Sequence, residues 1–382
     1  MGASGSIGAQ SLDILDQERD QFTLVAFSVG HRVEKIPAIL HGFPSVKHIC
    51  VQEEKDYVSL KERFPEVIWH HGGEGLKEII RLSDCDMVVN ALVGFAGLEP
   101  TLTALGDNKI LCLANKESLV VGGRLVNDLL SQGKGKLYPI DSEHVAIAKL
   151  FSRIPKEETE GLYITASGGA FRKKSREELA NVTAEEALAH PTWNMGAKIT
   201  IDCATMMNKG FEVIEAKVLF DYPLEKTHII LHDESHVHSF IKAKDGSLYA
   251  DVSAPDMHGP IAYALHEAKI DFELVQAKDL AGFGPFHFRD FKPERYPAPG
   301  IAVKAFELGP CHAAALNGAN EEAVYAFLRG EIGFLAIEEL VQLAVDNAKE
   351  VAPADYPVLK EADALAREYV NKQKRRFVHG LV

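Results

Sequence analysis

Short, continuously apolar runs alternate with segments of helical periodicity over the first 140 residues. The runs cover residues 22–29, 46–51, 67–70, 86–92, 109–114 and 136–140. Because they are apolar at successive positions, we expect parallel strands that are covered on both faces. The helical segments between them predict right-handed βαβ units, and therefore an α/β domain with a doubly wound, Rossmann-type sheet.

A different pattern follows residue 140. The stretch 161–169 predicts a strand that runs into a glycine turn, and 227–232 and 236–254 predict antiparallel strands with a hairpin turn at Asp245-Gly246. Apolar positions recur at helical spacing from residue 302 onward. We therefore expect a Rossmann-type cofactor-binding domain over 1–140, a central α+β catalytic domain over 141–281, a linker rich in glycine, proline and aromatic residues over 282–301, and a C-terminal helical domain over 302–382.

The chain opens with a glycine-rich turn, "GASGSIG", in which Gly2, Gly5 and Gly8 precede a predicted helix. Such a turn cradles phosphate at a helix N-terminus, although a plain glycine turn remains an alternative. The turn normally follows a buried strand, and here only Met1 precedes it. We therefore expect the first strand to be missing from the sheet and an apolar segment of about five to eight residues to precede Met1. The alternative is a sheet that closes around the gap.

The second strand position indicates which nicotinamide cofactor the turn would hold. A site for NAD usually has an acidic residue at the end of this strand, where it binds the ribose 2′-hydroxyl. The run 22–29 is followed instead by Gly30, His31 and Arg32, and a cation attracts the 2′-phosphate of NADPH. NADPH is therefore favoured, with a solvated arginine at a helix start as the alternative.

Several carboxylates stand where elements are expected to end. Asp141 and Glu143 follow the last strand of the first domain, and in an extended segment both would point the same way. Lys209 and Glu212 are spaced to share one face of a predicted helix. Three carboxylates without histidine or cysteine spacing suit magnesium or manganese better than zinc. Taken singly, each could equally be a surface charge.

Other polar residues stand beside glycine turns or at strand ends. Ser167 with Gly168 and Gly169 forms a candidate anion nest. The stretch 190–196, "HPTWNMG", predicts a shaped loop that could cover a ligand, although a hydrogen-bonded loop histidine is the simpler interpretation of His190 alone. "ANKE" (114–117) follows a strand, where open α/β sheets bind ligands.

Composition narrows the possible partners. The formal net charge of −14 argues against a nucleic-acid or anionic-membrane partner, since both need a basic surface. Five scattered cysteines without a C-x-x-C pair predict a reduced, cytoplasmic protein without structural zinc. No apolar run approaches the roughly 18 residues of a membrane span, and no signal peptide is visible.

Taken together, these stretches resemble the 1-deoxy-D-xylulose 5-phosphate reductoisomerase family. The motifs are "GASGSIG", "LANKESLV", "PIDSEHVAI", "ASGGAF", "HPTWNMG", "ATMMNKGFEVIEA", "PDMHGPIAYAL" and "LNGANEEAV", in family order. The resemblance implies an NADPH- and metal-dependent oxidoreductase of isoprenoid precursor biosynthesis. It would rearrange 1-deoxy-D-xylulose 5-phosphate, a small sugar phosphate, through retro-aldol and aldol steps, and reduce the product to 2-C-methyl-D-erythritol 4-phosphate. It also implies a homodimer with central-domain strands near the interface.

The resemblance assigns roles to matching positions. The implied metal ligands are Asp141, Glu143 and Glu212, and the implied catalytic residues are Lys116, Glu143 and His190. The implied substrate contacts are Ser142, Ser167, His190, Trp193, Cys203, Asn208, Lys209 and Glu212, of which Ser167, Cys203, Asn208 and Lys209 would bind the phosphate. The implied cofactor contacts are Gly2, Ala3, Ser4, Gly5, Ser6, Ile7, Gly30, His31, Arg32, Asn115, Lys116, Glu117, Met195 and Gly196. Trp193 and Met195 would lie on a loop that closes over substrate and nicotinamide.

The chain departs from the family pattern at a few positions. Cys203 replaces a usual serine, and because a thiol is the weaker hydrogen-bond donor, phosphate affinity is expected to fall. "LHDESHVHSF" lacks the usual His-Pro-Gln-Ser opening, and His258 stands where arginine is common. Two other functions stay open: an ordinary NADPH dehydrogenase, which would leave the three carboxylates idle, and a catalytically silent dimeric paralogue, against which the intact motifs argue.

Overall fold

The computed structural model describes residues 1–273 and 282–377, which divide into two compact units. The first unit comprises Met1–Asn115, Leu125–Asp141 and Met257–Val275, and the second comprises Lys116–Arg124, Ser142–Asp256 and Gln276–Val382. The expected division into four consecutive parts stays a prediction.

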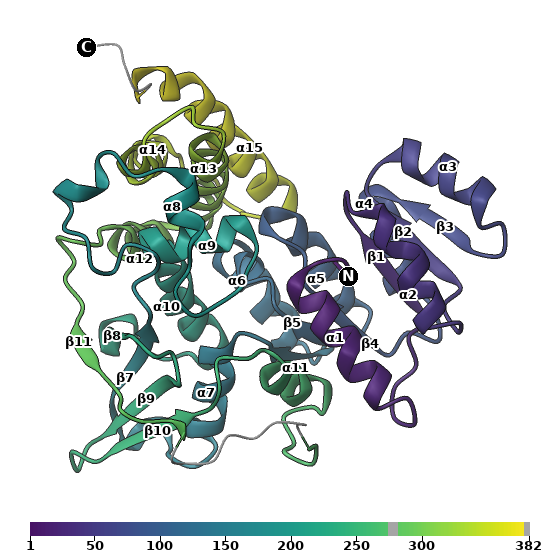
Figure 1. Cartoon of the computed structure of the whole chain (residues 1–382), viewed down its shortest axis with the longest axis horizontal. Helices are drawn as coiled ribbons and strands as arrows, with labels where there is room; N and C mark the ends of the chain where they lie inside the picture. The colour runs from purple at the N-terminus through teal and green to yellow at the C-terminus, as the bar shows by residue number, and fades with distance from the viewer. Residues whose placement is uncertain (274–281, 378–382) are drawn as a thin grey trace. The chain divides into compact units, whose positions relative to one another are not determined.

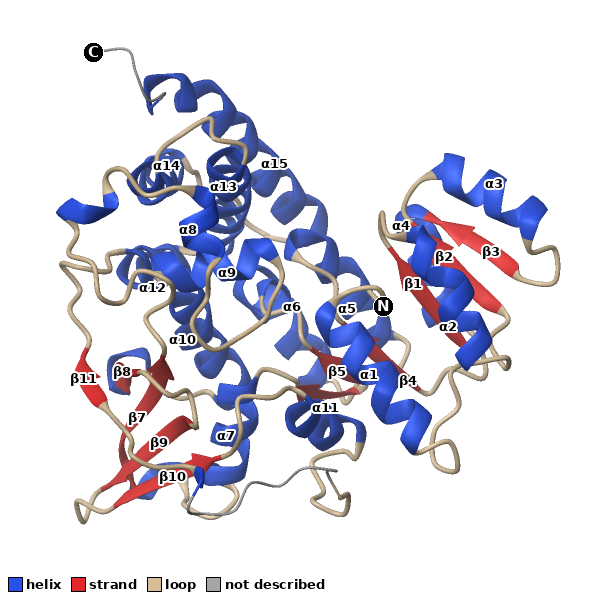
Figure 2. Ribbon diagram, viewed as in Figure 1, coloured by secondary structure: helices blue, strands red, loops and turns tan. Residues whose placement is uncertain are grey.

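Parallel strands and helices alternate along the first unit, as the sequence predicts (Figures 1 and 2). The strands are β1 (Ala26–Val29), β2 (His48–Val51), β3 (Ile68–His71), β4 (Met87–Asn90), β5 (Ile110–Leu113) and β6 (Lys136–Pro139). The helices are α1 (Ser6–Gln17), α2 (Ile36–Gly42), α3 (Glu54–Arg63), α4 (Gly72–Ile80), α5 (Leu98–Gly106), α11 (His258–Leu265) and the second half of α6 (Glu117–Ser131). Apolar side chains such as Phe27, Ile49 and Trp69 fill the core around β1 and β2, because these strands are covered on both faces.

The strands do not form the single sheet that the sequence predicted. They form two parallel sheets, in the orders β1-β2-β3 and β4-β5-β6. The first residues of the chain bridge the two sheets: the amino group of Met1 donates to the carbonyl of Val89, Ala91 N–H donates to the carbonyl of Met1, and Ala3 N–H donates to the carbonyl of Ser28. A cavity of about 140 Å³ lies beside Met1 and is lined mostly by apolar residues of both sheets. The sheet is thus divided at the position of its expected first strand.

The second unit contains a mixed five-stranded sheet in the order β10-β9-β7-β8-β11. Its strands are β7 (Thr159–Ala166), β8 (Thr227–His232), β9 (Val237–Ala243), β10 (Leu248–Val252) and β11 (Phe288–Asp290). The hairpin between β9 and β10 is confirmed, with Gly246 at a φ of +88° that favours glycine. One expectation was wrong: β8 runs parallel to β7 rather than in an antiparallel series. The residues of the expected linker include β11, which pairs with β8.

Helices complete the second unit (Figure 2). They are α7 (Ser142–Phe151), α8 (Ala184–Leu188), α9 (Ala197–Thr205), α10 (Met207–Phe220), α12 (Ala298–Leu308), α13 (Pro310–Leu328), α14 (Phe334–Asn347), α15 (Tyr356–Gln373) and the first half of α6. The expected C-terminal helices are confirmed, and α13 packs against α12, α14 and α15. Across the described ranges, no helix is both long and apolar enough to cross a membrane.

Candidate active site

Helix α10 is buried along nearly its whole length, yet it carries four polar side chains that reach the interior. Asn208, Lys209, Glu212 and Glu215 are each at most 6% exposed. Charged groups are rarely buried unless they are paired or bind a ligand. Met206, which joins α9 to α10, has a φ of 69°, a conformation that costs energy for a residue with a side chain and is found mainly at functional sites. The sequence and the backbone therefore both point to α10 as part of a site.

The three predicted metal ligands come together. Asp141 follows β6, Glu143 lies in the first turn of α7 and Glu212 lies on α10; one carboxylate oxygen from each is within 4.8 Å of the others. The proximity of Asp141 and Glu143 does not arise as expected, because α7 begins at Ser142 and the segment is not extended. The turn into the helix brings the two carboxylates together instead. Such a set of oxygen donors can hold a hard divalent cation.

Two lysines neutralise these carboxylates. Lys209 Nζ lies 2.9 Å from Glu143 Oε1 and 2.5 Å from Glu212 Oε2, as its predicted position on the same helix face requires. Lys116 Nζ lies 3.1 Å from Glu212 Oε1 and 2.7 Å from Asn208 Oδ1. Both ammonium groups are almost wholly buried, so the cluster offers fixed positive and negative charge in a poorly solvated place.

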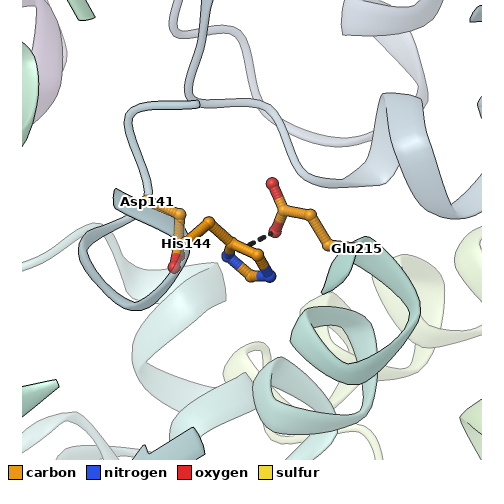
Figure 3. A group of neighbouring side chains, drawn as sticks. All are labelled: Asp141, His144 and Glu215. Atoms are coloured by element: carbon orange, nitrogen blue, oxygen red, sulfur yellow. Dashed lines mark ion pairs between the residues drawn. The ribbon is translucent and has the colours of Figure 1, made fainter. Parts of the chain in front are cut away.

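A second group, which the sequence analysis missed, adjoins the first and comprises Asp141, His144 and Glu215 (Figure 3). His144 Nε2 donates to the backbone carbonyl of Glu212 over 3.0 Å, which turns Nδ1 toward Glu215 Oε2 at 3.4 Å. His144 thereby joins α7 to α10 and fixes the backbone that carries Glu212. The histidine is visible in the motif "DSEH", but one histidine beside two carboxylates does not show which distant residue it will contact.

The glycine turn that was predicted as an anion nest lies at the end of β7. Gly168 and Gly169 have φ values of +79° and +66°, and a Cβ on Gly169 would come within 2.6 Å of the carbonyl oxygen of Cys203. The turn therefore lies against α9 at Cys203, so Ser167 and Cys203 belong to one place in the fold. Burial raises the pKa of the Cys203 thiol to about 12, and the group is a neutral thiol at physiological pH.

His190 has a fixed orientation beside this nest. The backbone N–H groups of Thr192 and Trp193 both donate to His190 Nδ1, at 3.3 and 3.0 Å. The proton of the neutral ring must therefore be on Nε2, which donates to Ser167 Oγ over 3.1 Å. Ser167 Oγ also accepts the N–H of Gly169, which leaves its own hydroxyl proton for a ligand.

The loop from 189 to 196 has no regular structure, as predicted. Trp193 and Met195 are half-buried, and the Trp193 ring lies 6.4 Å from the His238 ring between centroids. Gly196 is exposed and caps the N-terminus of α9. Ser142, at the start of α7, donates its hydroxyl to Glu143 Oε2 over 2.7 Å and so orients a predicted metal ligand.

Lys198 is a further buried charge that sequence reasoning missed. Its ammonium lies 2.7 Å from both Glu117 Oε1 and Asp202 Oδ2, and Asn320 of α13 donates to Asp202 over 2.8 Å. Burial disfavours the charged form of Glu117, but Lys198 more than offsets this and lowers the pKa of Glu117 below its ordinary value. Because Glu117 follows Lys116, this network fixes the segment that carries the Lys116 ammonium.

The glycine turn of the first unit has the geometry of a phosphate-binding loop. Gly2 has a φ of +77°, and a Cβ on Gly8 would lie 2.3 Å from the Gly2 carbonyl oxygen, so both positions require glycine. The predicted helix is confirmed as α1, whose N-cap Gly5 has no capping side chain. The residues Ala3, Ser4, Ser6 and Ile7 form the turn and the first helical residues.

Cations flank this turn in the first unit. Gly30, His31 and Arg32 follow β1, and the side chains of His31 and Arg32 are exposed. Lys35, which the sequence analysis did not single out, donates to the Ser4 carbonyl over 3.2 Å. Asn115 follows β5 and donates to the carbonyls of Leu92 and Gly94, so it fixes the loop after β4.

The chain is similar to known proteins. Three family models match the chain: 1-deoxy-D-xylulose 5-phosphate reductoisomerase over residues 1–123, the C-terminal domain of that enzyme over 137–220, and the DXP reductoisomerase C-terminal domain over 252–369. The 1-deoxy-D-xylulose 5-phosphate reductoisomerase of Geobacillus sp. (strain WCH70) is 44% identical, covering 97% of each chain. That of Bacillus cereus (strain AH187) is 42% identical, covering 98% of each chain.

Solved structures of reductoisomerases are also similar to this chain. The 1-deoxy-D-xylulose 5-phosphate reductoisomerase from Zymomonas mobilis in complex with NADPH has a TM-score of 0.88 and 35% identity, covering 98% of this chain and 97% of that one. A DOX-P reductoisomerase in complex with NADPH, fosmidomycin and magnesium has a TM-score of 0.91 at the same identity and coverage.

Proposed function

The chain belongs to the 1-deoxy-D-xylulose 5-phosphate reductoisomerase family, and from this premise we propose how its own residues carry out the family reaction. The enzyme uses NADPH and a divalent metal to convert 1-deoxy-D-xylulose 5-phosphate into 2-C-methyl-D-erythritol 4-phosphate in isoprenoid precursor synthesis. The observation that carries the residue assignment is the convergence of Asp141, Glu143 and Glu212 beside two buried lysines.

Asp141, Glu143 and Glu212 hold the metal in this proposal. Their oxygen-only donor set fits magnesium or manganese, and magnesium is bound in the related structure. The bound cation supplies Lewis-acid polarisation of the substrate's ketone and hydroxyl oxygens. Ser142 orients Glu143, and His144 fixes the backbone of Glu212, so the carboxylates are positioned before the cation binds.

The substrate phosphate binds at the Ser167–Gly169 nest. Ser167 donates its hydroxyl proton, because its oxygen already accepts from His190 and Gly169. Asn208, Lys209 and Cys203 complete the phosphate contacts, and the Cys203 thiol does so as a weak neutral donor. Lys116 is the donor proposed for the oxygens of the carbon skeleton, and His190, whose single N–H points to Ser167, is proposed to act on the substrate by orienting that hydroxyl. Trp193 and Met195 cover the substrate and exclude water.

The glycine turn binds the cofactor pyrophosphate at the N-terminus of α1. Arg32 binds the 2′-phosphate, with Lys35 as a second cation nearby. NADPH supplies the hydride that completes the reduction. The remaining predicted contacts, including Asn115, Glu117 and Gly196, act by shaping the loops around the nicotinamide.

We further propose a cytoplasmic homodimer. Five free cysteines suit a reducing compartment. The edge strand β10 exposes Leu248, Tyr249 and Val252, and an uncovered apolar edge is a natural surface for a second copy. Sedimentation at micromolar concentration tests this state.

The activity is tested by following NADPH oxidation with 1-deoxy-D-xylulose 5-phosphate and magnesium. We expect oxidation that requires the substrate and is abolished by EDTA. Oxidation that continues after EDTA treatment would instead support an ordinary dehydrogenase and would leave the carboxylate cluster without a role.

A further inference from the structure

A large cavity lies in the second unit, outside the residues assigned to catalysis. Its volume is about 970 Å³, at the upper end of the range for small-molecule sites. Two segments provide its polar wall, 172–177 and 289–295, and four residues provide an apolar wall, Ile230, Leu231, Phe288 and Tyr296. None of these residues belongs to the metal, substrate or cofactor sets proposed above.

The polar wall is strongly cationic in a chain whose net charge is −14. It contains seven basic side chains, Arg172, Lys173, Lys174, Arg176, Arg289, Lys292 and Arg295, against three acidic ones, Glu177, Asp290 and Glu294. A concentration of one sign of charge in a concave surface focuses the field on an incoming ion of the opposite sign. The cationic wall is therefore a local feature, and its charge is opposite in sign to the net charge of the whole protein.

Several of these cations are not neutralised by the protein. Arg176 pairs with Glu338 at 2.7 Å and Arg289 pairs with Asp233. In the described parts of the chain, by contrast, Lys173 and Lys292 are exposed and form no ion pair with a carboxylate. An anion entering the cavity would therefore meet lysines that are not already occupied.

Two of the guanidinium groups, those of Arg172 and Arg295, have no carboxylate partner among the described residues. Arg172 donates to the carbonyl of Asp233, and Arg295 donates to the carbonyls of Phe171 and Lys174, so both contact backbone oxygen rather than a carboxylate. Arg176 Nη1 is buried and has no hydrogen-bond acceptor among the described residues. A buried donor of this kind is costly unless a ligand or water satisfies it.

The apolar wall indicates that the ligand is more than an inorganic ion. Phe288 is 39% exposed on β11, and its ring stacks on that of His232 with the centroids 4.6 Å apart. An exposed aromatic ring in a cavity offers a face on which a planar or apolar organic group can pack.

We propose that this cavity binds an organic diphosphate. The phosphate groups lie against Lys173, Lys292 and the neighbouring arginines, and the organic part lies against Phe288. Two linked phosphates match the cations better than one, because the cations come from two separate segments of chain. The site is distinct from the substrate phosphate nest, although Arg172 continues the same turn three residues after Gly169.

Calorimetric titration of the full chain tests this proposal, with ADP, inorganic pyrophosphate and adenosine as probes. The protein is first saturated with NADPH, so that the cofactor site is filled, and magnesium is omitted because pyrophosphate binds it. We expect ADP to bind more tightly than pyrophosphate, and adenosine to bind much more weakly than either. Equal affinity for ADP and pyrophosphate would overturn the role given to Phe288.

Charge-reversal variants locate the binding. K173E/K292E should weaken ADP and pyrophosphate by roughly tenfold or more, because two charge-assisted contacts become repulsive. The matched control K226E/K244E makes the same charge change at exposed lysines outside the cavity and should bind as the parent does. Both variants should keep the NADPH oxidation rate, which shows that they are folded. Equal binding by the two variants, or no binding of either phosphate to the parent, would overturn the proposal.

Discussion

His190 shows how one side chain can be set by backbone contacts alone. Two backbone N–H groups fix the proton on Nε2, and Nε2 in turn orients Ser167. Burial, with Arg172 and Lys209 nearby, lowers the pKa of His190 from 6.5 to about 4. The ring is therefore a neutral donor at physiological pH, which is the form that the hydrogen bond to Ser167 needs.

This lowered pKa predicts a pH dependence of stability. The unfolded chain takes up the His190 proton near pH 6.5, whereas the folded protein does so only near pH 4. The contribution of neutral His190 to the free energy of unfolding is therefore complete above about pH 6.5 and is lost as the pH falls toward 4. In denaturant titrations, the parent should lose unfolding free energy more steeply over this window than His190→Gln. Parallel curves for the two proteins would contradict the assigned pKa.

Arg32 carries the predicted preference for NADPH. We expect Arg32→Ala to weaken NADPH by roughly tenfold or more, because a charge-assisted contact to the 2′-phosphate contributes about 1.5–3 kcal/mol, and to affect NADH much less. Fluorescence titration with both cofactors measures the ratio. Arg63→Ala removes another exposed arginine of the first unit and should leave the ratio unchanged. An equal loss for both cofactors would assign Arg32 a structural role only.

Cys203 is predicted to weaken phosphate binding. Replacing it in Cys203→Ser restores a stronger donor against the nest, so the KM for the substrate should fall by a few-fold. The KM for NADPH, measured on the same variant, should stay the same. A raised substrate KM would mean that the surrounding residues have adapted to the larger thiol.

At the scale of elements, the strands and helices of the first unit followed from the sequence because a strand covered on both faces needs a continuously apolar run. Strand partners did not follow: β8 was expected in an antiparallel series, because an apolar run does not specify its neighbour, and β11 was not predicted as a strand. The same limit applies around α10. The Lys209–Glu212 spacing on this helix could be recognised in the sequence. His144 and Lys198, on neighbouring helices, could be assigned a role only once their buried partners were known.

The gap between β1 and β4 predicts the effect of adding a strand. An apolar extension of about six residues before Met1 should fill the cavity and pair with both sheets. It would also replace a buried amino group, whose pKa burial lowers to about 6, with a peptide bond. We expect Tm to rise by several degrees and NADPH to bind more tightly. A glycine–serine extension of equal length is the control, and equal behaviour of the two would contradict the prediction.

At the scale of the whole molecule, charge is unevenly distributed. The acidic total left small anionic substrates open, but it concealed the local cations at Lys116 and Lys209 and around the large cavity. Family membership followed from motifs spread over nearly the whole chain, and the comparisons confirm it. The carboxylates proposed as metal ligands could be named because short motifs carry them. Their neighbours could not, since burial is a property of the folded chain.

The central claim is that the reaction depends on a cation held by Asp141, Glu143 and Glu212. The most direct measurement is the magnesium dependence of NADPH oxidation by Glu143→Gln, which keeps the side-chain size and removes one charge. We predict a turnover at least about a hundredfold below that of the parent at saturating magnesium, with an unchanged far-ultraviolet circular dichroism spectrum. Near-parental turnover at saturating magnesium would contradict the account.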